Sequence, residues 1–351
     1  MQITLIDQEV LKKKYYKNCP SGYFLESDNL WDMEKYLDKQ NFLKPNEQLK
    51  SVSVAGNGNM NLVLRVKSNL RSFIVKQSRP WVEKYPHIEA PDERSIIEGQ
   101  FYGLIKLKNG IEKFFPDLLK LDAPSGVLIL EDLGEAADYM NIYRKEFRVD
   151  IGEIQKLVLI LSELHSSYNV NTTNERIYNR SMRKLNARHI FDFPFSTDND
   201  FDLDKIQLGL AEITEAYKKN DLLLEKVKKL KQVYLSDGHF LLMGDYYPGS
   251  WLNTNNGIRV IDPEFCFFGP VEFDLGVLIA HLIMSGHEDT VEMALSQYYG
   301  TDQVDRALLN AFASVEIFRR IMGIAQLPLP YTVEEKSKLL AFAFEMLQSF
   351  K

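Results

Sequence analysis

The chain has 351 residues, enough for one large or two ordinary domains with a buried core. Hydrophobic residues make up 45% of it and charged residues 26%, which is the composition of an ordinary soluble globular protein. The formal net charge of −7 offers no electrostatic basis for binding nucleic acid, so that class of partner is excluded.

The cysteines and the N-terminus indicate where the protein works. Cys19 and Cys266 are the only cysteines, and neither has His or Cys neighbours at metal-ligand spacing, so no zinc site or disulfide framework is expected. The N-terminus lacks the pattern of a secretory signal, and no window reaches membrane-spanning length. These features predict a cytoplasmic protein that does not contact a membrane.

The region from about residue 50 to 132 is rich in β-strand patterns. The predicted strands are SVSVAG, NLVLRV, SFIVKQ, DLLKLD and GVLILEDL, with one helix around residues 93–107. Such a pattern indicates a small sheet that carries a single helix. The segment Glu131-Asp132-Leu133-Gly134 ends the last strand and is interpreted as a hinge.

After residue 150 the pattern becomes helical. In IGEIQKLVLILSELHSSY, apolar residues fall on one stripe, and further helices are predicted at about 203–235, 274–299, 303–324 and 333–350. We therefore predict an α+β protein with an N-terminal lobe over residues 1–132 and a mainly helical C-terminal lobe over residues 133–351.

A glycine-containing turn joins the first two predicted strands. Gly56, Asn57, Gly58 and Asn59 lie in this turn, and glycines let backbone amides approach an anion without a Cβ in the way. The alternative is an ordinary hairpin turn, in which Asn and Gly are the commonest residues.

Two charged residues follow that turn. Lys76 closes the apolar segment Phe73-Ile74-Val75, where a lysine can reach nucleotide phosphates; the alternative is an exposed lysine at a strand end. Glu98 in the next helix is the expected partner of Lys76, with Glu93 as the competing choice. Glu131 and Leu133 would offer backbone groups to an adenine ring.

Two acidic clusters flank a predicted β-hairpin within residues 241–265. Asp245 ends an apolar run, and Asp262 and Glu264 follow a second run after an Asn-Asn-Gly turn, so both clusters sit at strand ends. Phosphoryl transfer needs one carboxylate beside the acceptor hydroxyl and others to hold Mg²⁺ against the nucleotide phosphates. Asp245 suits the first role and the other two suit the second; the alternative is that all three are turn and cap residues.

These features occur in kinase-like order and resemble the aminoglycoside phosphotransferase and choline kinase superfamily. Within it the chain is most similar to the 5-methylthioribose kinases. The resemblance covers residues 55–326 and rests on AGNGNMNLVLRV, FIVKQSRPWV, MGDYYPGS, VIDPEFCFFGPVEFDLG and FRRIMGIAQ. It implies a two-lobed protein-kinase-like fold with a small antiparallel sheet in the N-terminal lobe.

The resemblance also implies roles for individual residues. Asp245 would be the catalytic base toward the anomeric hydroxyl of the sugar, Asp262 and Glu264 would bind Mg²⁺, and Lys76 would contact the ATP phosphates. Arg319 and Arg320 would line the sugar and phosphate side of the site, where a guanidinium offers forked donors to oxygen atoms. The alternative for these arginines is an ion pair on a helix surface.

Other residues are given supporting roles. Asp274 is expected to brace the catalytic loop, or to cap a helix. His165 is interpreted as a structural or capping histidine. Trp81 and Trp251 would either cover the thioether of the substrate or pack in the core.

Two departures from the superfamily pattern bear on function. Met243 stands where most members have histidine, and Tyr246-Tyr247-Pro248 replaces the usual linker after the base. The predicted activity is transfer of the ATP γ-phosphoryl group to the 1-hydroxyl of 5-methylthioribose in methionine salvage, and the resembled family implies a possible homodimer. The alternatives are an aminoglycoside phosphotransferase-like kinase for another sugar or amino alcohol, and a nucleotide-binding pseudokinase.

Overall fold

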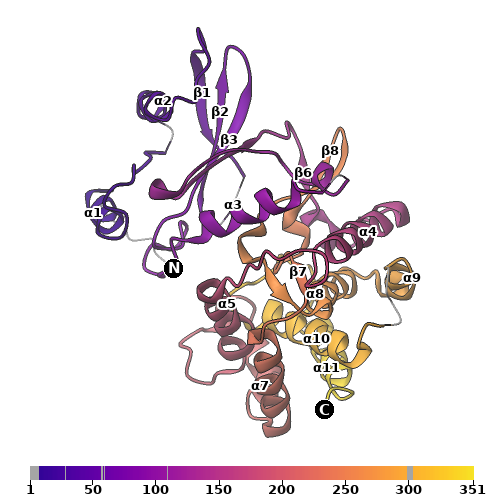
Figure 1. The fold of residues 1–351 in the computed structure, drawn as a ribbon. Helices are drawn as coiled ribbons and strands as arrows, with labels where there is room; N and C mark the ends of the chain where they lie inside the picture. The colour runs from indigo at the N-terminus through magenta and orange to yellow at the C-terminus, as the bar shows by residue number, and fades with distance from the viewer. Residues whose placement is uncertain (1–7, 28, 57, 59, 109, 299–302) are drawn as a thin grey trace. The chain divides into compact units, whose positions relative to one another are not determined.

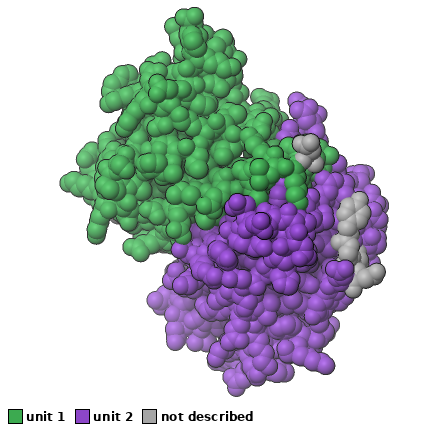
Figure 2. Space-filling view, viewed as in Figure 1, with its two compact units in different colours: residues 1–135 green, residues 136–351 purple. Residues whose placement is uncertain are grey.

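The chain divides into two compact units in the computed structural model. The structure describes residues 8–27, 29–56, 58, 60–108, 110–298 and 303–351. Unit 1 is Met1–Glu135 and unit 2 is Ala136–Lys351 (Figure 2).

Unit 1 contains a five-stranded antiparallel sheet in the order β1-β2-β3-β5-β4 (Figure 1). The strands are β1 (Leu49–Val54), β2 (Leu62–Ser68), β3 (Ser72–Gln77), β4 (Leu118–Asp122) and β5 (Val127–Glu131). The central strands β3 and β5 are rich in Val, Ile and Leu, and most of their side chains are buried. The predicted small antiparallel sheet is confirmed.

Helices cover this sheet. The predicted helix is α3 (Arg94–Ile105), which packs against β4 and β5. Two further helices, α1 (Gln8–Asn18) and α2 (Leu30–Lys39), precede the sheet and were not predicted. Asn29 caps α2 by accepting a hydrogen bond from the N–H of Asp32, and α2 adds Met33, Tyr36 and Leu37 to the core under the sheet.

Unit 2 is mainly helical. Its longer helices are α4 (Ile151–Ser167), α5 (Arg180–Ala187), α6 (Leu210–Lys218), α7 (Asp221–Leu235), α8 (Val271–Met284), α9 (Val291–Ser296), α10 (Arg306–Met322) and α11 (Val333–Leu347). α8 is buried along its whole length and packs closely on α10. Gly276 permits this approach, because a Cβ there would lie only 2.8 Å from the Cβ of Phe312.

Two of the predicted helices are each broken in two. The helix predicted at 203–235 is divided because Asn220 adopts an extended conformation and caps α7, accepting from the N–H of Leu223. The helix predicted at 274–299 ends at Met284, because Gly286 takes a left-handed conformation with φ of 74°.

Short strands complete unit 2. β7 (Phe240–Leu242) pairs with β10 (Phe267–Gly269), and β8 (Trp251–Thr254) forms the predicted hairpin with β9 (Gly257–Val260). β6 (Ala137–Asp138) pairs with β8. Among the described residues, no helix is both long and apolar enough to cross a membrane.

Candidate active site

The β7–β10 pairing places the two acidic clusters at the ends of one strand pair. Leu242 at the end of β7 is opposite Phe267 at the start of β10, so the chain between them leaves and returns at the same edge. Asp245 lies three residues after β7, and Glu264 lies three residues before β10. The sequence expectation that both clusters sit at strand ends is confirmed.

Helix α8 fixes the loop that carries Asp245. Asp274 Oδ2 accepts a hydrogen bond of 2.7 Å from the N–H of Met243, and its Oδ1 accepts one of 3.0 Å from the N–H of Gly244. His165 Nε2 lies 3.3 Å from Asp274 Oδ2. The bracing role predicted for Asp274 is confirmed, and His165 supports it from the end of α4.

Asp262 and Glu264 flank the start of a single turn of 3₁₀ helix, η8 (Pro263–Phe265). Asp262 has a left-handed backbone (φ 62°, ψ 53°) and makes no side-chain capping bond, so helix capping does not explain it. Glu264 is buried, and its carbonyl oxygen accepts a hydrogen bond of 2.9 Å from the side chain of Asn179. Asn179, the residue before α5, also donates to the carbonyl oxygen of Cys266, so its side chain ties the turn to the start of that helix.

The donor set in this turn suits Mg²⁺. Carboxylate oxygens are the ligands that Mg²⁺ prefers, and the ion is commonly held by one or two of them together with waters and substrate phosphates. No group of three or more His, Cys, Asp or Glu side chains able to hold a metal occurs within the described residues. Asp262 and Glu264 supply two carboxylates of this kind in one turn.

Arg319 and Arg320 of α10 reach the carboxylate of Asp245. Arg319 Nη1 and Arg320 Nη2 each lie 3.5 Å from Asp245 Oδ1. Both arginines are 6% exposed, so the alternative of ion pairs on a helix surface is wrong. Within the described residues Asp245 Oδ2 accepts no hydrogen bond, and the Asp245 side chain is 17% exposed.

Glu316 holds both arginines from one turn earlier on α10. Arg320 Nε donates to Glu316 Oε1 at 2.5 Å, and Arg319 Nη1 donates to Glu316 Oε2 at 3.0 Å. Burial raises the pKa of Glu316, but the charges of Arg319 and Arg320 and the contact with His281 outweigh burial and hold this pKa well below its usual range. Sequence reasoning missed Glu316, although its i,i+3 and i,i+4 spacing to the arginines on a predicted helix was the available signal.

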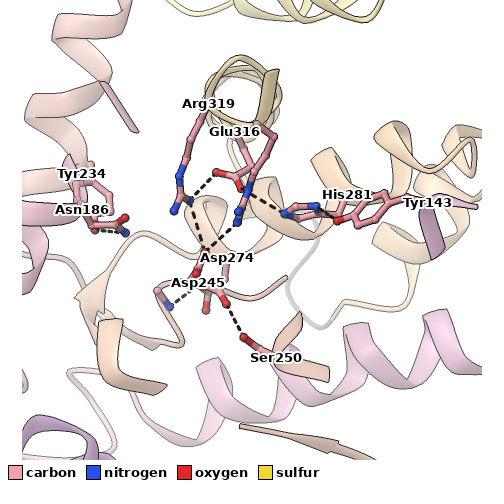
Figure 3. Close-up of polar contacts among 11 residues, drawn as sticks. Tyr143, Asn186, Tyr234, Asp245, Ser250, Asp274, His281, Glu316 and Arg319 are labelled. Atoms are coloured by element: carbon pink, nitrogen blue, oxygen red, sulfur yellow. Dashed lines mark hydrogen bonds and ion pairs between the residues drawn. The ribbon is translucent and has the colours of Figure 1, made fainter. Parts of the chain in front are cut away.

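Aromatic and histidine side chains enclose the arginine pair. Tyr247 packs with its ring 4.8 Å from the Arg320 guanidinium carbon, a cation–π contact. Burial and the nearby Asp245 raise the pKa of Tyr247 to about 12, so its hydroxyl stays protonated. His281 of α8 lies between Glu316 and Tyr143 (Figure 3).

In unit 1, Lys76 and Glu98 form a buried ion pair. Lys76 is on the central strand β3, Glu98 is on α3, and Lys76 Nζ lies 2.7 Å from Glu98 Oε2. The predicted pairing is confirmed. Glu93 is exposed and precedes α3, so the competing choice is wrong, and so is the alternative of an exposed lysine at a strand end.

The remaining nucleotide candidates also belong to unit 1. Gly56 has a left-handed backbone with φ of 71°, and a Cβ at Gly56 or Gly58 would meet no atom within 4 Å. Asn57 and Asn59 lie outside the described residues. Glu131 ends β5, where its N–H donates to Asp117 O at 2.8 Å, and Leu133 follows two residues later.

The tryptophans are core residues. Trp81 packs with Tyr15 and Phe24 in unit 1, and Trp251 packs with Tyr246 at a ring distance of 5.4 Å in unit 2. Both rings are 0% exposed, so neither presents a face to a substrate.

Solved structures with the same arrangement of elements define the fold. The choline kinase LicA of Streptococcus pneumoniae matches with a TM-score of 0.51 and 15% identity, over 91% of this chain and 99% of that one. The AMP-bound spectinomycin phosphotransferase APH(9)-Ia matches with a TM-score of 0.53 and 14% identity, over 93% and 98%. The chain has the protein-kinase-like fold of small-molecule phosphotransferases.

Sequence comparison gives a narrower similarity than the fold does, to methylthioribose kinases. The chain is 29% identical over 320 residues to the methylthioribose kinase of Bacillus velezensis, which covers 77% of each chain. It is 25% identical over 336 residues to the methylthioribose kinase of Geobacillus thermodenitrificans, which covers 82% of each. No protein-family model matches the sequence. The predicted resemblance to methylthioribose kinases is confirmed.

Proposed function

We propose that this protein is an ATP-dependent kinase that phosphorylates the 1-hydroxyl of 5-methylthioribose. The observation that carries the proposal is Asp245, whose Oδ1 faces two buried arginines while its Oδ2 accepts no hydrogen bond within the described part of the chain. A carboxylate presented in this way can orient a hydroxyl group and accept its proton. The methylthioribose kinases among the sequence relatives support the choice of acceptor.

The reaction is an in-line transfer. The acceptor oxygen forms a bond to the γ-phosphorus, the bond from that phosphorus to the β–γ bridging oxygen breaks, ADP leaves, and the hydroxyl proton passes to Asp245. Lys76, positioned by Glu98, contacts the nucleotide phosphates with the turn at Gly56, Asn57, Gly58 and Asn59, and the backbone at Glu131 and Leu133 meets the adenine ring. Mg²⁺ held by Asp262 and Glu264 would neutralise phosphate charge.

The arginine pair has donors left for the substrate. Each guanidinium carries five N–H donors. Within the described residues, Arg319 Nη2 and Arg320 Nη1 make no hydrogen bond. Sugar hydroxyls or the transferred phosphoryl group would accept from them, whereas a cationic amino alcohol or aminoglycoside would face two like charges. The pair therefore favours a sugar over a cationic amino alcohol or aminoglycoside.

A coupled ADP-release assay tests the proposal. Wild-type protein and Asp245→Asn are compared with Mg-ATP and 5-methylthioribose, ribose, choline or kanamycin, and ATP binding is measured separately. We expect turnover with 5-methylthioribose that falls by about 10²- to 10⁴-fold in Asp245→Asn, with ATP binding retained. Turnover with kanamycin or choline alone would show that this compound, and not 5-methylthioribose, is the acceptor. ATP binding without transfer to any acceptor would identify a pseudokinase.

Two further properties belong to the proposal. The two cysteines are far apart in the sequence and fit a reducing, cytoplasmic setting, which fractionation of cells would test. A homodimer follows from the resemblance to methylthioribose kinases, and sedimentation equilibrium would distinguish a dimer from a monomer.

A further inference from the structure

Glu316 and Asp245 share the same two arginines unequally. The arginine nitrogens lie 2.5 Å and 3.0 Å from Glu316 but 3.5 Å from Asp245. Charge-assisted N–H···O bonds are usually about 2.7–2.9 Å long. The guanidiniums therefore bind Glu316 closely and Asp245 loosely.

The charges explain why this inequality matters. Two guanidiniums and two carboxylates balance in a largely buried setting, where an unpaired charge is costly. If Glu316 were neutral, both arginines would face Asp245 as their only carboxylate in this cluster, and they would close on it. Closure would engage the second oxygen of Asp245, the atom that is needed to accept the hydroxyl proton.

Glu316 also contacts a histidine, through the same oxygen that accepts from Arg320. His281 Nε2 lies 3.3 Å from Glu316 Oε1, and the Tyr143 hydroxyl lies 2.6 Å from His281 Nδ1. Burial lowers the pKa of His281, so its ring is neutral and carries one proton. We assign that proton to Nε2, because Glu316 is an ionised acceptor, and Tyr143 then donates to Nδ1.

We infer that Glu316 is a positioning residue for phosphoryl transfer. It holds one edge of each guanidinium, keeps Arg319 and Arg320 beside Asp245 without letting them close on it, and leaves their outer N–H groups for the acceptor and the transferred phosphoryl group. His281 and Tyr143 fix Glu316 in that orientation (Figure 3). This inference rests on the proposed function.

The test is steady-state kinetics of Glu316→Gln with Mg-ATP and 5-methylthioribose. Gln keeps the size of the side chain but removes its charge. We expect kcat to fall by roughly 10- to 100-fold and the acceptor KM to rise, because a misplacement of about 1 Å has effects of this size, while the ATP dissociation constant stays unchanged. A simple loss of folded protein would instead lower apparent kcat with both KM values unchanged.

Glu272→Gln is the matched control. Glu272 is a buried glutamate of α8 that accepts a hydrogen bond from the N–H of Asp305, and the acceptor KM of this variant is expected to match wild type. If Glu316→Gln does not fold, Glu316→Asp keeps the charge but shortens the reach, and should show the same changes in kcat and acceptor KM at smaller size. Wild-type values of both in a folded Glu316 variant would overturn the inference.

A second readout does not depend on the acceptor. In crystal structures of wild type and Glu316→Gln, we expect the arginine-to-Asp245 distances to shorten from 3.5 Å to below about 3 Å in the variant. Unchanged distances would overturn the inference even if wild type proved inactive on 5-methylthioribose. Inactivity of wild type on that sugar would overturn the proposed acceptor alone.

Discussion

Asp274 Oδ1 accepts a 3.0 Å hydrogen bond from the N–H of Gly244, so the buried helix α8 holds the backbone of the loop that carries Asp245. The second oxygen accepts from the N–H of Met243. Met243, where most of the resembled superfamily has histidine, is 1% exposed, and its side chain contributes to the core. The bracing of the loop thus depends on backbone amides, which the departure at position 243 leaves intact.

Asp274→Asn should loosen this loop. An amide side chain offers only one acceptor oxygen, so one of the two backbone N–H groups loses its partner and the free energy of unfolding falls by about 1–3 kcal/mol. Turnover should fall more than ATP binding, because the lysine pair of unit 1 is untouched. Urea unfolding and ADP release measure the two effects.

The control for Asp274→Asn is Asp192→Asn. Asp192 pairs with Lys231 on the surface at 2.6 Å, and its side chain is 46% exposed, so little change is expected in stability or turnover. Equal effects of the two variants would show that Asp274 does not brace the loop.

Gly244→Ala should be among the most damaging single-methyl additions in unit 2. Gly244 has φ of 81°, and a Cβ there would lie 2.1 Å from the carbonyl oxygen of Phe265, in the turn of Asp262 and Glu264. Gly257→Ala is the matched control, because Gly257 has φ of 92° but its Cβ would meet no atom within 4 Å. In both variants an alanine must adopt a positive φ, which costs about 1 kcal/mol. The difference between their unfolding free energies therefore measures the close contact of residue 244 with Phe265.

We expect Gly244→Ala to be destabilised by more than 2 kcal/mol beyond Gly257→Ala, roughly the cost of an overpacked core. Thermal or urea unfolding of both variants measures this difference. Equal stabilities would mean that Gly244 and Phe265 are not in close contact.

The sequence predicted the parts of this protein that depend on local pattern. Alternating apolar residues located the strands of unit 1, and the Asn-Asn-Gly turn located the β8–β9 hairpin. The residues that were missed depend on tertiary contacts. Glu316 acquires its importance only when α10 packs on α8 and brings His281 beside it. Neither the pairing of distant helices nor the start of α3 at Arg94, which leaves Glu93 outside the helix, follows from periodicity alone.

The first helix shows a second limit. In α1 the apolar residues are few and only Tyr15 is buried, so no helical stripe is visible in the sequence. The segment Arg188–Asp192, a π-helix after α5, also has no sequence signature.

A double-mutant cycle should reveal strong coupling between Lys76 and Glu98. Their side chains are 4% and 1% exposed, so removing one partner takes away an opposite charge that lies 2.7 Å from a buried ion, at a cost of about 3–5 kcal/mol. In the double variant Lys76→Met, Glu98→Gln no charge is left over, so its unfolding free energy should exceed the additive value by about 1–3 kcal/mol.

The exposed pair Lys106 and Asp117 provides the comparison within unit 1. Their side chains are 43% and 61% exposed at an N–O distance of 3.2 Å, so the corresponding cycle with Lys106→Met and Asp117→Asn should give a coupling near zero. Similar coupling in the two cycles would contradict burial of the Lys76–Glu98 pair.

Stability at acid pH should depend on His189, in the π-helical segment. Burial, with the charges of Arg319 and Arg188, lowers the pKa of His189 from its ordinary value of 6.5 to about 4. Between these pH values the unfolded chain binds a proton that the folded protein does not. The contribution of this group to stability is therefore complete above pH 6.5 and is lost as the pH falls toward 4.

His189→Gln removes this titration, so its unfolding free energy should fall less steeply than that of wild type from pH 7 to pH 5. The difference in slope is at most about 1.4 kcal/mol per pH unit, reduced because the ring is partly exposed. His239→Gln, the same substitution at an exposed histidine, is the control. Urea unfolding at several pH values measures the slopes; parallel curves for wild type and His189→Gln would show that His189 is not held neutral beside Arg319.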